Sequence, residues 1–488
     1  MSLFEHHRME WTPKMLTALD IKNFKAFSEW QSLTLAPITL IYGPNSSGKS
    51  SIIHSIMLLK QSLTRPSTQG GLVSNGEYVD LGDYSSMVNR HDISKEISFR
   101  LSYSPQKKQV GADLRTSPFG SSHLRSYAFD YAYSGTENNS TYEGFSYLKK
   151  FHISITNEKK APVFDAAFSS SIKDTKKEPL SKRLAASKKF ILLTDDSVAE
   201  FLERKTRTWD KLKIDDIKKS LLSTDFQTDL NFSTPCMSVT DIKSAAAFSM
   251  TAGVILNYTI GETASDLKEK LSSVTYLGPL RSHPSRFYAP RGDQNDSVGK
   301  LGENVARFIY EQSPEITIKI NSWFEKFEIP YELSARSIGD NVTGTVICLQ
   351  LRDTRSDVVV GPSDVGFGIG QMLPIIVEGI VREDSIICVE QPEIHLHPRL
   401  QAHLADFIIE TSKKNQWIIE THSESLLLRL QNRIYQGLKK EQVSVNYVEP
   451  TSNGGEIIRI PLDDEGDFCR EFPDGFFEER IREKRIRR

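Results

Sequence analysis

The chain has 488 residues, of which 38% are hydrophobic and 25% are charged, and 61 basic and 63 acidic side chains give a formal net charge of −2. This composition is typical of a globular protein and excludes a disordered tail, a fibre or a mini-protein. At roughly 150 residues per domain, the length predicts two or three folding units. The near-neutral charge excludes a chain that binds polyanions over its whole surface, so any nucleic-acid surface must be local.

Neither a membrane span nor a disulfide framework is expected. Apolar runs such as residues 373–380 are much shorter than the ~20 residues that cross a bilayer, and residues 1–14 lack the apolar core of a signal peptide. The four cysteines are too far apart in the sequence to form the close pairs of a zinc site. We therefore expect a cytoplasmic protein that makes no contact with a membrane.

The amino-terminal region predicts two strands, then a glycine loop, then a helix. Apolar and polar positions alternate between residues 16 and 24, and an apolar run covers residues 35–42. Residues 51–63 place their apolar side chains at helical spacing. A phosphate-binding loop requires this order of strand, glycine loop and helix.

The glycine loop at residues 43–50 fits the pattern G-x-x-x-x-G-K-[ST], and we call it the phosphate loop. Its glycines let the backbone curl so that N–H groups point at phosphate oxygens, and the following helix adds a favourable dipole. Lys49 is expected to reach the β and γ phosphates of ATP, and the Ser50 hydroxyl is expected to ligate Mg²⁺. The residues predicted to bind the nucleotide here are Gly43, Pro44, Asn45, Ser46, Ser47, Gly48, Lys49, Ser50 and Ser51.

Residues 91–270 differ in composition from the regions on either side. Short strand-like runs at 96–103 and 151–156 alternate with serine and lysine clusters and with a helical stretch at 198–222. Residues 149–220 contain 18 basic and 11 acidic side chains, and no sustained heptad pattern predicts a coiled-coil arm. We expect an insertion domain of α+β structure.

From residue 274 onward the chain again predicts strands. Residues 385–389 form an apolar run that leads into Glu390, a carboxylate suited to hold Mg²⁺ beside the phosphate loop. A glycine-rich turn that opens a helix comes before this strand, and a further apolar strand leads to His422. Because Glu390 lies so far along the chain from Lys49, the nucleotide-binding head must be split by a large insertion.

This order resembles that of the ABC-type ATPases of the SMC and OLD (overcoming lysogenization defect) groups: phosphate loop, insertion, signature turn, acidic strand, D-loop, switch histidine. More narrowly, residues 276–281, 390–398 and 420–424 are similar to stand-alone bacterial ATPases, some of which serve anti-phage systems such as Septu and PARIS. The resemblance covers about residues 1–90 and 274–488 and leaves the insertion largely unmatched.

The resemblance implies an α/β fold, an ABC-type P-loop ATPase head with a mixed central sheet that is split by a large α+β insertion. We expect residues 1–90 and 271–450 to form the two parts of the head. Residues 91–270 form the insertion, which we assign to dimerisation or partner binding, and residues 451–488 form a short carboxy-terminal domain with a basic tail.

The resemblance also makes the glycine-rich turn the signature turn, which in this class contacts the γ-phosphate held by the opposite subunit. Two heads would therefore close around two ATP molecules. Glycines followed by a helix amino terminus suit such a contact with an anion. A glycine stands at position 368, where the family usually has a serine. The nucleotide-binding residues predicted here are Gly366, Gly368, Gly370 and Gln371.

Three histidines follow the acidic strand. The resemblance makes His422 the switch histidine, which hydrogen-bonds the γ-phosphate or the attacking water. His395 and His397 have the alternate spacing of a metal site, but they fall in the D-loop segment and have no acidic or cysteine partners around them in the sequence. We therefore reject a metal site at these two positions.

Gln391 departs from the family pattern, which places a catalytic glutamate directly after the metal-holding carboxylate. An amide does not accept the proton of an attacking water as a carboxylate does. The hypothesis is slow hydrolysis, with ATP-bound heads that stay closed for long periods. Either Glu393 or His422 is a candidate partial substitute for the base. The predicted catalytic residues are therefore Glu390, Gln391, Glu393 and His422, with Ser50 and Glu390 on the metal.

The leading hypothesis for function is an ATP-gated sensor and scaffold of an anti-phage system, which forms a homodimer through its heads. OLD-type nucleases carry a metal-dependent TOPRIM domain after the ATPase, and the stretch that follows His422 is too short for one. Nuclease chemistry would then come from a separately encoded effector nuclease that this protein controls.

Two alternatives belong to other classes. An SMC-like ATPase of DNA repair or chromosome maintenance would clamp duplex DNA, with support from the basic excess at 149–220 and from six basic residues against one glutamate at 480–488. Solvated lysine runs account for the same pattern. A transporter subunit is disfavoured because such subunits place a shorter segment between the phosphate loop and the signature turn.

Overall fold

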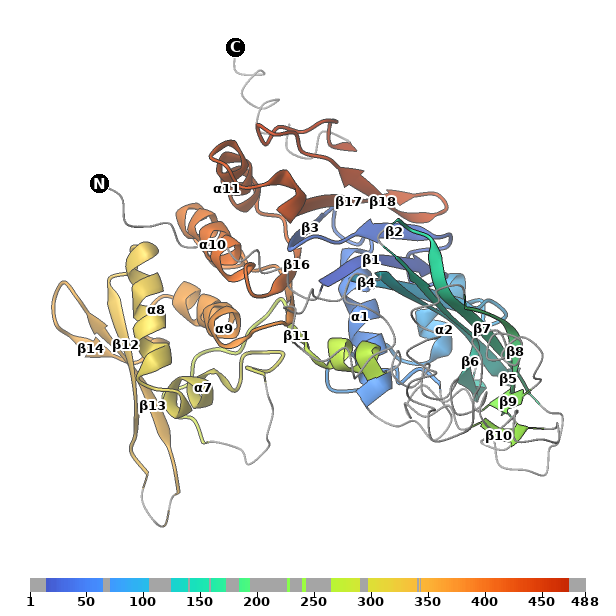
Figure 1. Cartoon of the computed structure of the whole chain (residues 1–488). Coiled ribbons are helices and arrows are strands. Elements are labelled where there is room, and N and C mark those ends of the chain that lie inside the picture. Colours follow the sequence, from blue (N-terminus) through green and yellow to red (C-terminus); the bar gives the residue numbers. More distant parts are fainter. Residues whose placement is uncertain are drawn as a thin grey trace, which may run out of the picture.

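The computed structural model describes residues 15–64, 71–104, 124–138, 141–157, 159–172, 184–193, 226–228, 239–242, 265–289, 297–339, 342 and 344–473. These residues form three β-sheets with helices between and beside them (Figure 1). The α/β class predicted from the sequence is confirmed. The helical stretch expected at 198–222, much of the basic region 149–220 and the tail 480–488 lie outside the described residues.

A six-stranded sheet leads to the predicted site. Its strands are β3 (Ile38–Tyr42), β11 (Val274–Leu277), β15 (Ile386–Glu390), β16 (Gln416–Glu420), β17 (Val443–Thr451) and β18 (Gly454–Ile460). The strand order is β11-β15-β16-β3-β17-β18, and all pairs are parallel except β17 with β18. β3, β11, β15 and β16 are buried along their whole length, which explains their continuously apolar sequences.

Each face of this sheet packs on its own apolar core. Ile386 and Cys388 of β15 belong to a core that includes helix α1 (Lys49–Thr64), and Ile387 and Val389 belong to a second core on the opposite face. This division follows from the alternation of side chains along a strand. The second core also contains side chains of three helices, α9 (Phe367–Val381), α10 (Pro398–Thr411) and α11 (Glu424–Tyr435).

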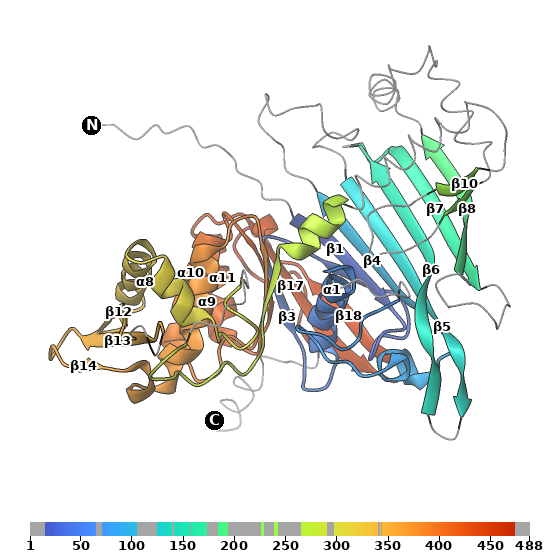
Figure 2. The same ribbon diagram turned by 90° about the horizontal axis from the view of Figure 1, so that it is seen from below.

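A nine-stranded antiparallel sheet covers the α1 side of the molecule, so that α1 lies between the two sheets (Figure 2). Its strands are β1 (Met15–Lys22), β2 (Gln31–Thr34), β4 (Ile97–Ser104), β5 (Leu124–Asn138), β6 (Thr141–Thr156), β7 (Pro162–Ile172), β8 (Leu184–Leu193), β9 (Phe226–Thr228) and β10 (Val239–Ile242). The order is β10-β9-β8-β7-β6-β5-β4-β1-β2. Strands β4 to β10, which come from the expected insertion, therefore extend the sheet that β1 and β2 begin.

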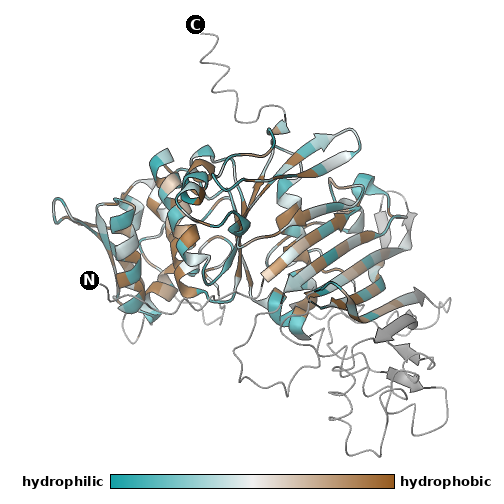
Figure 3. Ribbon diagram, turned by 45° about the horizontal axis from the view of Figure 1, so that its top comes forward, coloured by the Kyte–Doolittle hydropathy of each residue, from teal (hydrophilic) through white to brown (hydrophobic). Residues whose placement is uncertain are grey.

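Apolar and polar residues alternate along several strands of this sheet (Figure 3), as one buried face and one open face require. In β4, for example, Ile97, Phe99, Leu101 and Tyr103 are buried, and their neighbour Arg100 is exposed. The buried side chains join the core that holds α1. The nine-stranded sheet therefore fixes the position of the helix that follows the phosphate loop.

A smaller lobe packs against α9 on the far side of the second core (Figure 1). It consists of α7 (Val305–Glu311), α8 (Glu315–Lys326) and a three-stranded sheet of β12 (Tyr331–Ser337), β13 (Ile347–Asp353) and β14 (Val359–Val360). Short elements elsewhere are a helix at residues 265–272, α2 (Tyr84–Met87), η1 (Asn89–His91), η2 (Pro362–Asp364) and η3 (Lys440–Gln442).

The described part of the carboxy-terminal stretch closes on the central sheet. β18 pairs with β17 at the sheet edge, and the ring of Phe472 lies edge-on to Tyr42 and Tyr447 with centroids 6.1 and 5.8 Å away. These aromatic contacts seal the second core beside β3. Within the described residues, no helix combines the length and apolar character needed to cross a membrane.

Candidate active site

The phosphate loop joins β3 to α1 in a tight curl. Gly43, Ser46 and Gly48 have positive φ angles of 148°, 62° and 106°. A Cβ at Gly43 would lie only 2.4 Å from the carbonyl oxygen of Val448, so this position requires glycine on both backbone and steric grounds. Helix α1 begins at Lys49, and the first N–H groups of a helix have no partner within the helix. The loop and helix start therefore form an anion-binding arrangement.

Lys49 lies across this loop. Its side chain is buried, and Nζ donates a hydrogen bond to the carbonyl oxygen of Pro44 at 2.7 Å. Burial lowers the pKa of Lys49, while the nearby carboxylates of Glu420 and Glu393 oppose that shift. Of the other predicted loop residues, Asn45 and Ser46 are exposed, whereas Ser47 and Ser51 are buried.

Three parallel strands end beside the loop. In the sheet, β16 lies between β3 and β15, so Glu420 pairs with Ile41 on one side and with Glu390 on the other. Neighbouring strands lie about 4.8 Å apart, which places the two carboxylates side by side below the phosphate loop. The structure therefore brings together segments that are distant in sequence, and it adds a second acidic residue to the predicted one.

Glu390 is buried and accepts a hydrogen bond from the hydroxyl of Tyr276 at 3.0 Å. Nε2 of His54, one helical turn after Ser50, lies 3.3 Å from the same oxygen, Oε1. Burial, followed by the negative charge of Glu390, raises the pKa of Tyr276. The phenol thus stays protonated and serves as a hydrogen-bond donor to the carboxylate.

Glu420 is 3% exposed, and its carboxylate lies near Ser50, Lys49 and His54. Burial raises the pKa of Glu420 to about 7, with the charge of Glu390 as the second cause, while Ser50 and Lys49 oppose the shift. Its Oε2 atom is buried, and within the described part of the chain no group forms a hydrogen bond with it. The carboxylate next to the Ser50 hydroxyl is therefore that of Glu420.

The turn after β15 connects the two acidic strand ends. Gln391 has a positive φ of 45°, and its N–H donates to the carbonyl oxygen of Glu420 at 2.7 Å. Glu393 accepts hydrogen bonds from the Thr421 hydroxyl at 2.7 Å and from the His422 N–H at 2.6 Å. Burial raises the pKa of Glu393, and burial with the charge of Lys49 lowers the pKa of His422. Glu393 thus fixes the backbone that carries the predicted switch histidine.

Arg281, in the loop after β11, joins this turn to helix α9. Its guanidinium donates to the carbonyl oxygens of Glu390 at 2.8 Å and Gln391 at 3.1 Å. Its own N–H and carbonyl exchange hydrogen bonds with the side-chain amide of Gln371, which is completely buried. The structure therefore turns Gln371 toward Arg281 of its own chain, and the predicted contact of Gln371 with a nucleotide stays a prediction.

The glycines of the predicted signature turn differ in their surroundings. Gly366 is exposed, and a Cβ there would meet no atom within 4 Å. A Cβ at Gly368 would lie 3.0 Å from the carbonyl oxygen of His395, and one at Gly370 would lie 2.3 Å from Cγ of Pro284. The second half of the turn is therefore closely packed against the D-loop segment and the loop after β11, while its start is open.

His395 and His397, for which a metal site was rejected, are both exposed. The Nδ1 atom of His397 accepts a hydrogen bond from the Arg399 N–H at 3.3 Å and so caps α10. The described residues contain no group of three or more His, Cys, Asp or Glu side chains that could hold a metal ion.

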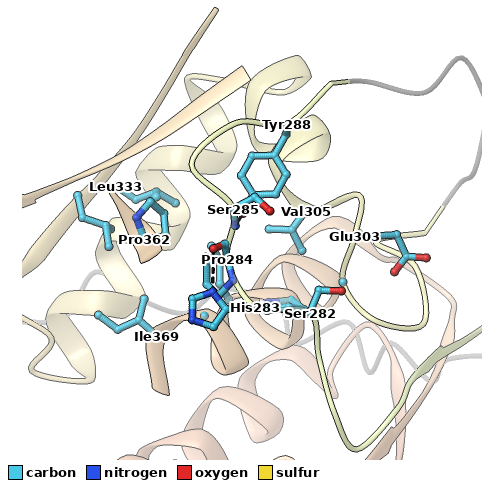
Figure 4. A pocket seen from close by; sticks show the side chains of 15 residues that line it. Ser282, His283, Pro284, Ser285, Tyr288, Glu303, Val305, Leu333, Pro362 and Ile369 are labelled. Atoms are coloured by element: carbon cyan, nitrogen blue, oxygen red, sulfur yellow. Dashed lines mark hydrogen bonds between the residues drawn. The ribbon is translucent and has the colours of Figure 1, made fainter. Parts of the chain in front are cut away.

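A cavity of about 170 Å³ lies beside the start of α9, and its lining, shown in Figure 4, includes no residue of the phosphate loop. Its walls come from the loop after β11, the start of α7, strands β12 and β13, and the first turns of α9. Pro284 and Tyr288 line it from the loop, and Gly370 and Leu373 line it from α9. It therefore lies behind the signature turn rather than at the acidic strand ends.

Comparisons with known proteins identify the family. Residues 15–427 match the family described as AAA ATPase domain, and the chain belongs to that family. No curated protein matches the chain. The SMC head domain from Thermotoga maritima is similar to it with 10% identity over 92% of this chain and 99% of that chain, at a TM-score of 0.35. The Smc head domain with an extended coiled coil, bound to the C-terminal domain of ScpA, from Pyrococcus furiosus has 12% identity over 97% and 100% of the two chains, at a TM-score of 0.41.

Family membership confirms the ATPase class and the P-loop predicted from the sequence. The structure also shows site residues for which the sequence patterns predicted no role: His54, Tyr276, Arg281 and Glu420. For two of these residues, the sequence contains a pattern that could have predicted a place in the site. His54 follows Ser50 by one helical turn, and Glu420 ends an apolar strand two residues before His422, just as Glu390 ends its own strand.

Proposed function

We propose that the protein binds ATP with Mg²⁺ at the phosphate loop and hydrolyses it slowly. The observation that carries this proposal is the meeting of Lys49 and Ser50 with the buried carboxylates of Glu390 and Glu420 at the ends of β3, β15 and β16. The loop N–H groups and Lys49 supply positive charge for the phosphates. The Ser50 hydroxyl and carboxylate oxygens are the ligand type that Mg²⁺ prefers, and one of them, Oε2 of Glu420, has no hydrogen-bond partner among the described residues, so the residues fit the ion.

Slow hydrolysis follows from the residue after Glu390. Gln391 has no group that takes up the proton of water at neutral pH. Glu393 already accepts two hydrogen bonds, from Thr421 and His422. We therefore assign it the role of positioning these two residues. The lowered pKa of His422 keeps its imidazole neutral at pH 7, a form that accepts a hydrogen bond from the attacking water.

We further propose that two copies associate through their heads, with the signature turn of each facing the nucleotide of the other. The open start of the turn at Gly366 supports this, because no described atom blocks an approaching phosphate there. Two large apolar side chains in the adjoining loop, Leu280 and Phe287, are 66% and 59% exposed and suit a self-association face.

At the level of biology, we propose an ATP-gated sensor and scaffold that controls a separately encoded effector nuclease in an anti-phage system. The support is the sequence resemblance at residues 276–281, 390–398 and 420–424. The alternative of direct DNA binding depends on basic clusters that lie largely outside the described residues, and no described contact favours it.

Two measurements test these proposals. Mass measurement of the purified protein with and without ATP and Mg²⁺ is expected to show a dimer that forms with the nucleotide, and an unchanged monomer would contradict the head-dimer proposal. Co-purification with the products of neighbouring genes is expected to recover a nuclease. An isolated housekeeping locus would contradict the defence role.

A further inference from the structure

The cavity beside the start of α9 (Figure 4), which we call the α9 cavity, has an apolar floor and a polar rim. The buried apolar side chains that line it are Val305, Leu333, Leu351 and Leu373. The exposed polar side chains that line it are Ser282, His283, Ser285 and Glu303. A hollow with an apolar floor and a few polar groups around it is typical of a site for a small organic molecule.

The volume of the α9 cavity restricts what it can hold. The cavity measures about 170 Å³. An engineered apolar cavity of about 150 Å³ in another protein binds one molecule of benzene. A nucleotide or a larger ring system therefore exceeds the space, and we expect an occupant with one six-membered ring and few substituents.

Pro374 gives one wall of the α9 cavity a hydrogen-bond acceptor. This residue lies inside α9, and a proline within a helix has no N–H for the carbonyl four positions earlier and pushes that carbonyl away with its ring. The carbonyl concerned is that of Gly370, and Gly370 and Pro374 both line the cavity. The Gly370 carbonyl therefore lacks its regular helical donor, and a ligand with an N–H or O–H group can take the place of that donor.

The charges at the rim favour an uncharged ligand over an anion. Glu303 brings a carboxylate to the rim, where it accepts a hydrogen bond from the Leu301 N–H at 2.9 Å. The guanidinium of Arg286, in the loop after β11, is already paired with Asp364 at 2.5 Å. An anion in the cavity would be repelled by Glu303, and the Arg286 charge that could offset this repulsion is engaged elsewhere.

The loop at residues 282–288, which forms one wall of the α9 cavity, is anchored at both ends. At its start, Arg281 exchanges two hydrogen bonds with Gln371 of α9. At its end, Tyr288 exchanges backbone hydrogen bonds of 2.9 and 2.8 Å with Ile347 of β13. A ring in the cavity would contact this loop and the first turns of α9 together. It would therefore favour the arrangement in which the two are close.

We propose that the α9 cavity is an effector site for an uncharged aromatic amine or phenol with a single ring, and that the bound ligand promotes association of the heads. The ring would lie among the apolar side chains, and its donor would meet the Gly370 carbonyl. The binding site depends only on the cavity. The effect on association rests on the proposed function, because the predicted signature turn at the start of α9 would then face the nucleotide of a second copy.

The binding test compares aniline with toluene, which has nearly the same shape but no hydrogen-bond donor, by ligand-observed NMR on the full chain. Wild-type protein is expected to bind aniline with a Kd of about 1 mM or tighter, which is attainable for a ligand of this size. Toluene is expected to bind about fivefold more weakly, because one net hydrogen bond is lost. Absence of saturable aniline binding would overturn the site, and equal affinities would overturn the role of the Gly370 carbonyl.

Three variants sharpen the binding test. Pro374→Ala supplies the missing N–H to Gly370, so the affinities for aniline and toluene are expected to become equal. Ser282→Phe places a large side chain at the exposed rim and is expected to weaken both ligands by about tenfold or more. Ser334→Phe is the matched control, because Ser334 is exposed on β12 and points away from the cavity that its neighbour Leu333 lines.

The control variant is expected to bind both ligands as wild type does. Unchanged binding in folded Ser282→Phe would overturn the location of the site, whether or not Pro374→Ala folds.

The effect on association is tested by mass measurement at a concentration of a non-hydrolysable ATP analogue, with Mg²⁺, that gives part of the protein as dimer. Saturating aniline is expected to raise the association constant of wild type about fivefold or more and to leave that of Ser282→Phe unchanged. An unchanged constant in wild type with aniline bound would overturn the effector role. Absence of any dimer with the analogue would instead contradict the proposed head association, while the NMR titrations still decide the binding site.

Discussion

Gln371 and Arg281 exchange two hydrogen bonds across the interior of the head. The Arg281 N–H donates to Gln371 Oε1 at 3.3 Å, and Gln371 Nε2 donates to the Arg281 carbonyl oxygen at 3.1 Å. Because the Arg281 guanidinium in turn bonds the carbonyl oxygens of Glu390 and Gln391, the pair connects the start of α9 to the acidic end of β15. The predicted signature turn and the site beside the phosphate loop are thereby parts of one hydrogen-bonded unit.

The first prediction concerns this connection. Arg281→Lys keeps a positive charge but lacks the planar fork that reaches two carbonyl oxygens at once. Each buried acceptor left without its donor costs about 1–3 kcal/mol, so the variant is expected to unfold at a lower temperature than wild type and to release phosphate more slowly. Thermal unfolding and steady-state phosphate release measure the two effects. A variant with unchanged unfolding temperature and unchanged turnover would show that the connection is dispensable.

The second prediction concerns Gln391. Gln391→Glu has nearly the same shape but introduces a carboxylate that can take up the proton of the attacking water. Positioned general bases typically contribute about a hundredfold or more, so phosphate release in single-turnover experiments is expected to increase by that order. Gln391→Asn is a matched control, since it keeps an amide and should stay slow. Equal rates for Gln391→Glu and wild type would mean that the amide is not what limits hydrolysis.

The third prediction uses the pKa of Glu420, which burial raises to about 7 in the fold from an ordinary value near 4.5. The folded protein therefore binds a proton at this group more tightly than the unfolded chain does. This contribution to stability is fully present below about pH 4.5 and is lost as the pH rises through about 7. Glu420→Gln does not titrate, so it escapes the loss.

We expect the free energy of unfolding of Glu420→Gln, measured relative to wild type in EDTA without nucleotide, to increase by on the order of 3 kcal/mol between pH 4.5 and pH 8. Denaturant unfolding at a series of pH values gives this difference, and the subtraction removes the other titrating groups that the two proteins share. A difference that stays constant over this range would contradict a raised pKa at Glu420.

Much of the fold was predictable from local sequence patterns. The apolar runs at residues 35–42 and 385–389 became buried parallel strands, and the run at 51–63, with its apolar side chains at helical spacing, became α1. The phosphate loop could be predicted because glycine, lysine and serine at this fixed spacing are compatible with few other structures. Family membership confirmed the ATPase class that these motifs predicted.

The arrangement of the strands was not predictable in the same way. Which strand lies between β3 and β15 depends on pairing across hundreds of residues, and that pairing alone places Glu420 beside Glu390 and Ser50. The roles of Tyr276 and Arg281 likewise depend on a loop that reaches β15 from another part of the chain. Local patterns also gave no sign that β4 to β10 would extend the sheet of β1 and β2.

The most direct test of the account is the affinity for ATP with Mg²⁺ of wild type and of Lys49→Ala, measured on the full chain by titration calorimetry. Lys49 lies across the phosphate loop, near the carboxylates of Glu420 and Glu393, so loss of its charge removes a charged hydrogen bond to the phosphates. We predict that the affinity falls by about a hundredfold while the unfolding temperature stays near that of wild type. Undiminished affinity in Lys49→Ala would contradict the assignment of this site to the nucleotide.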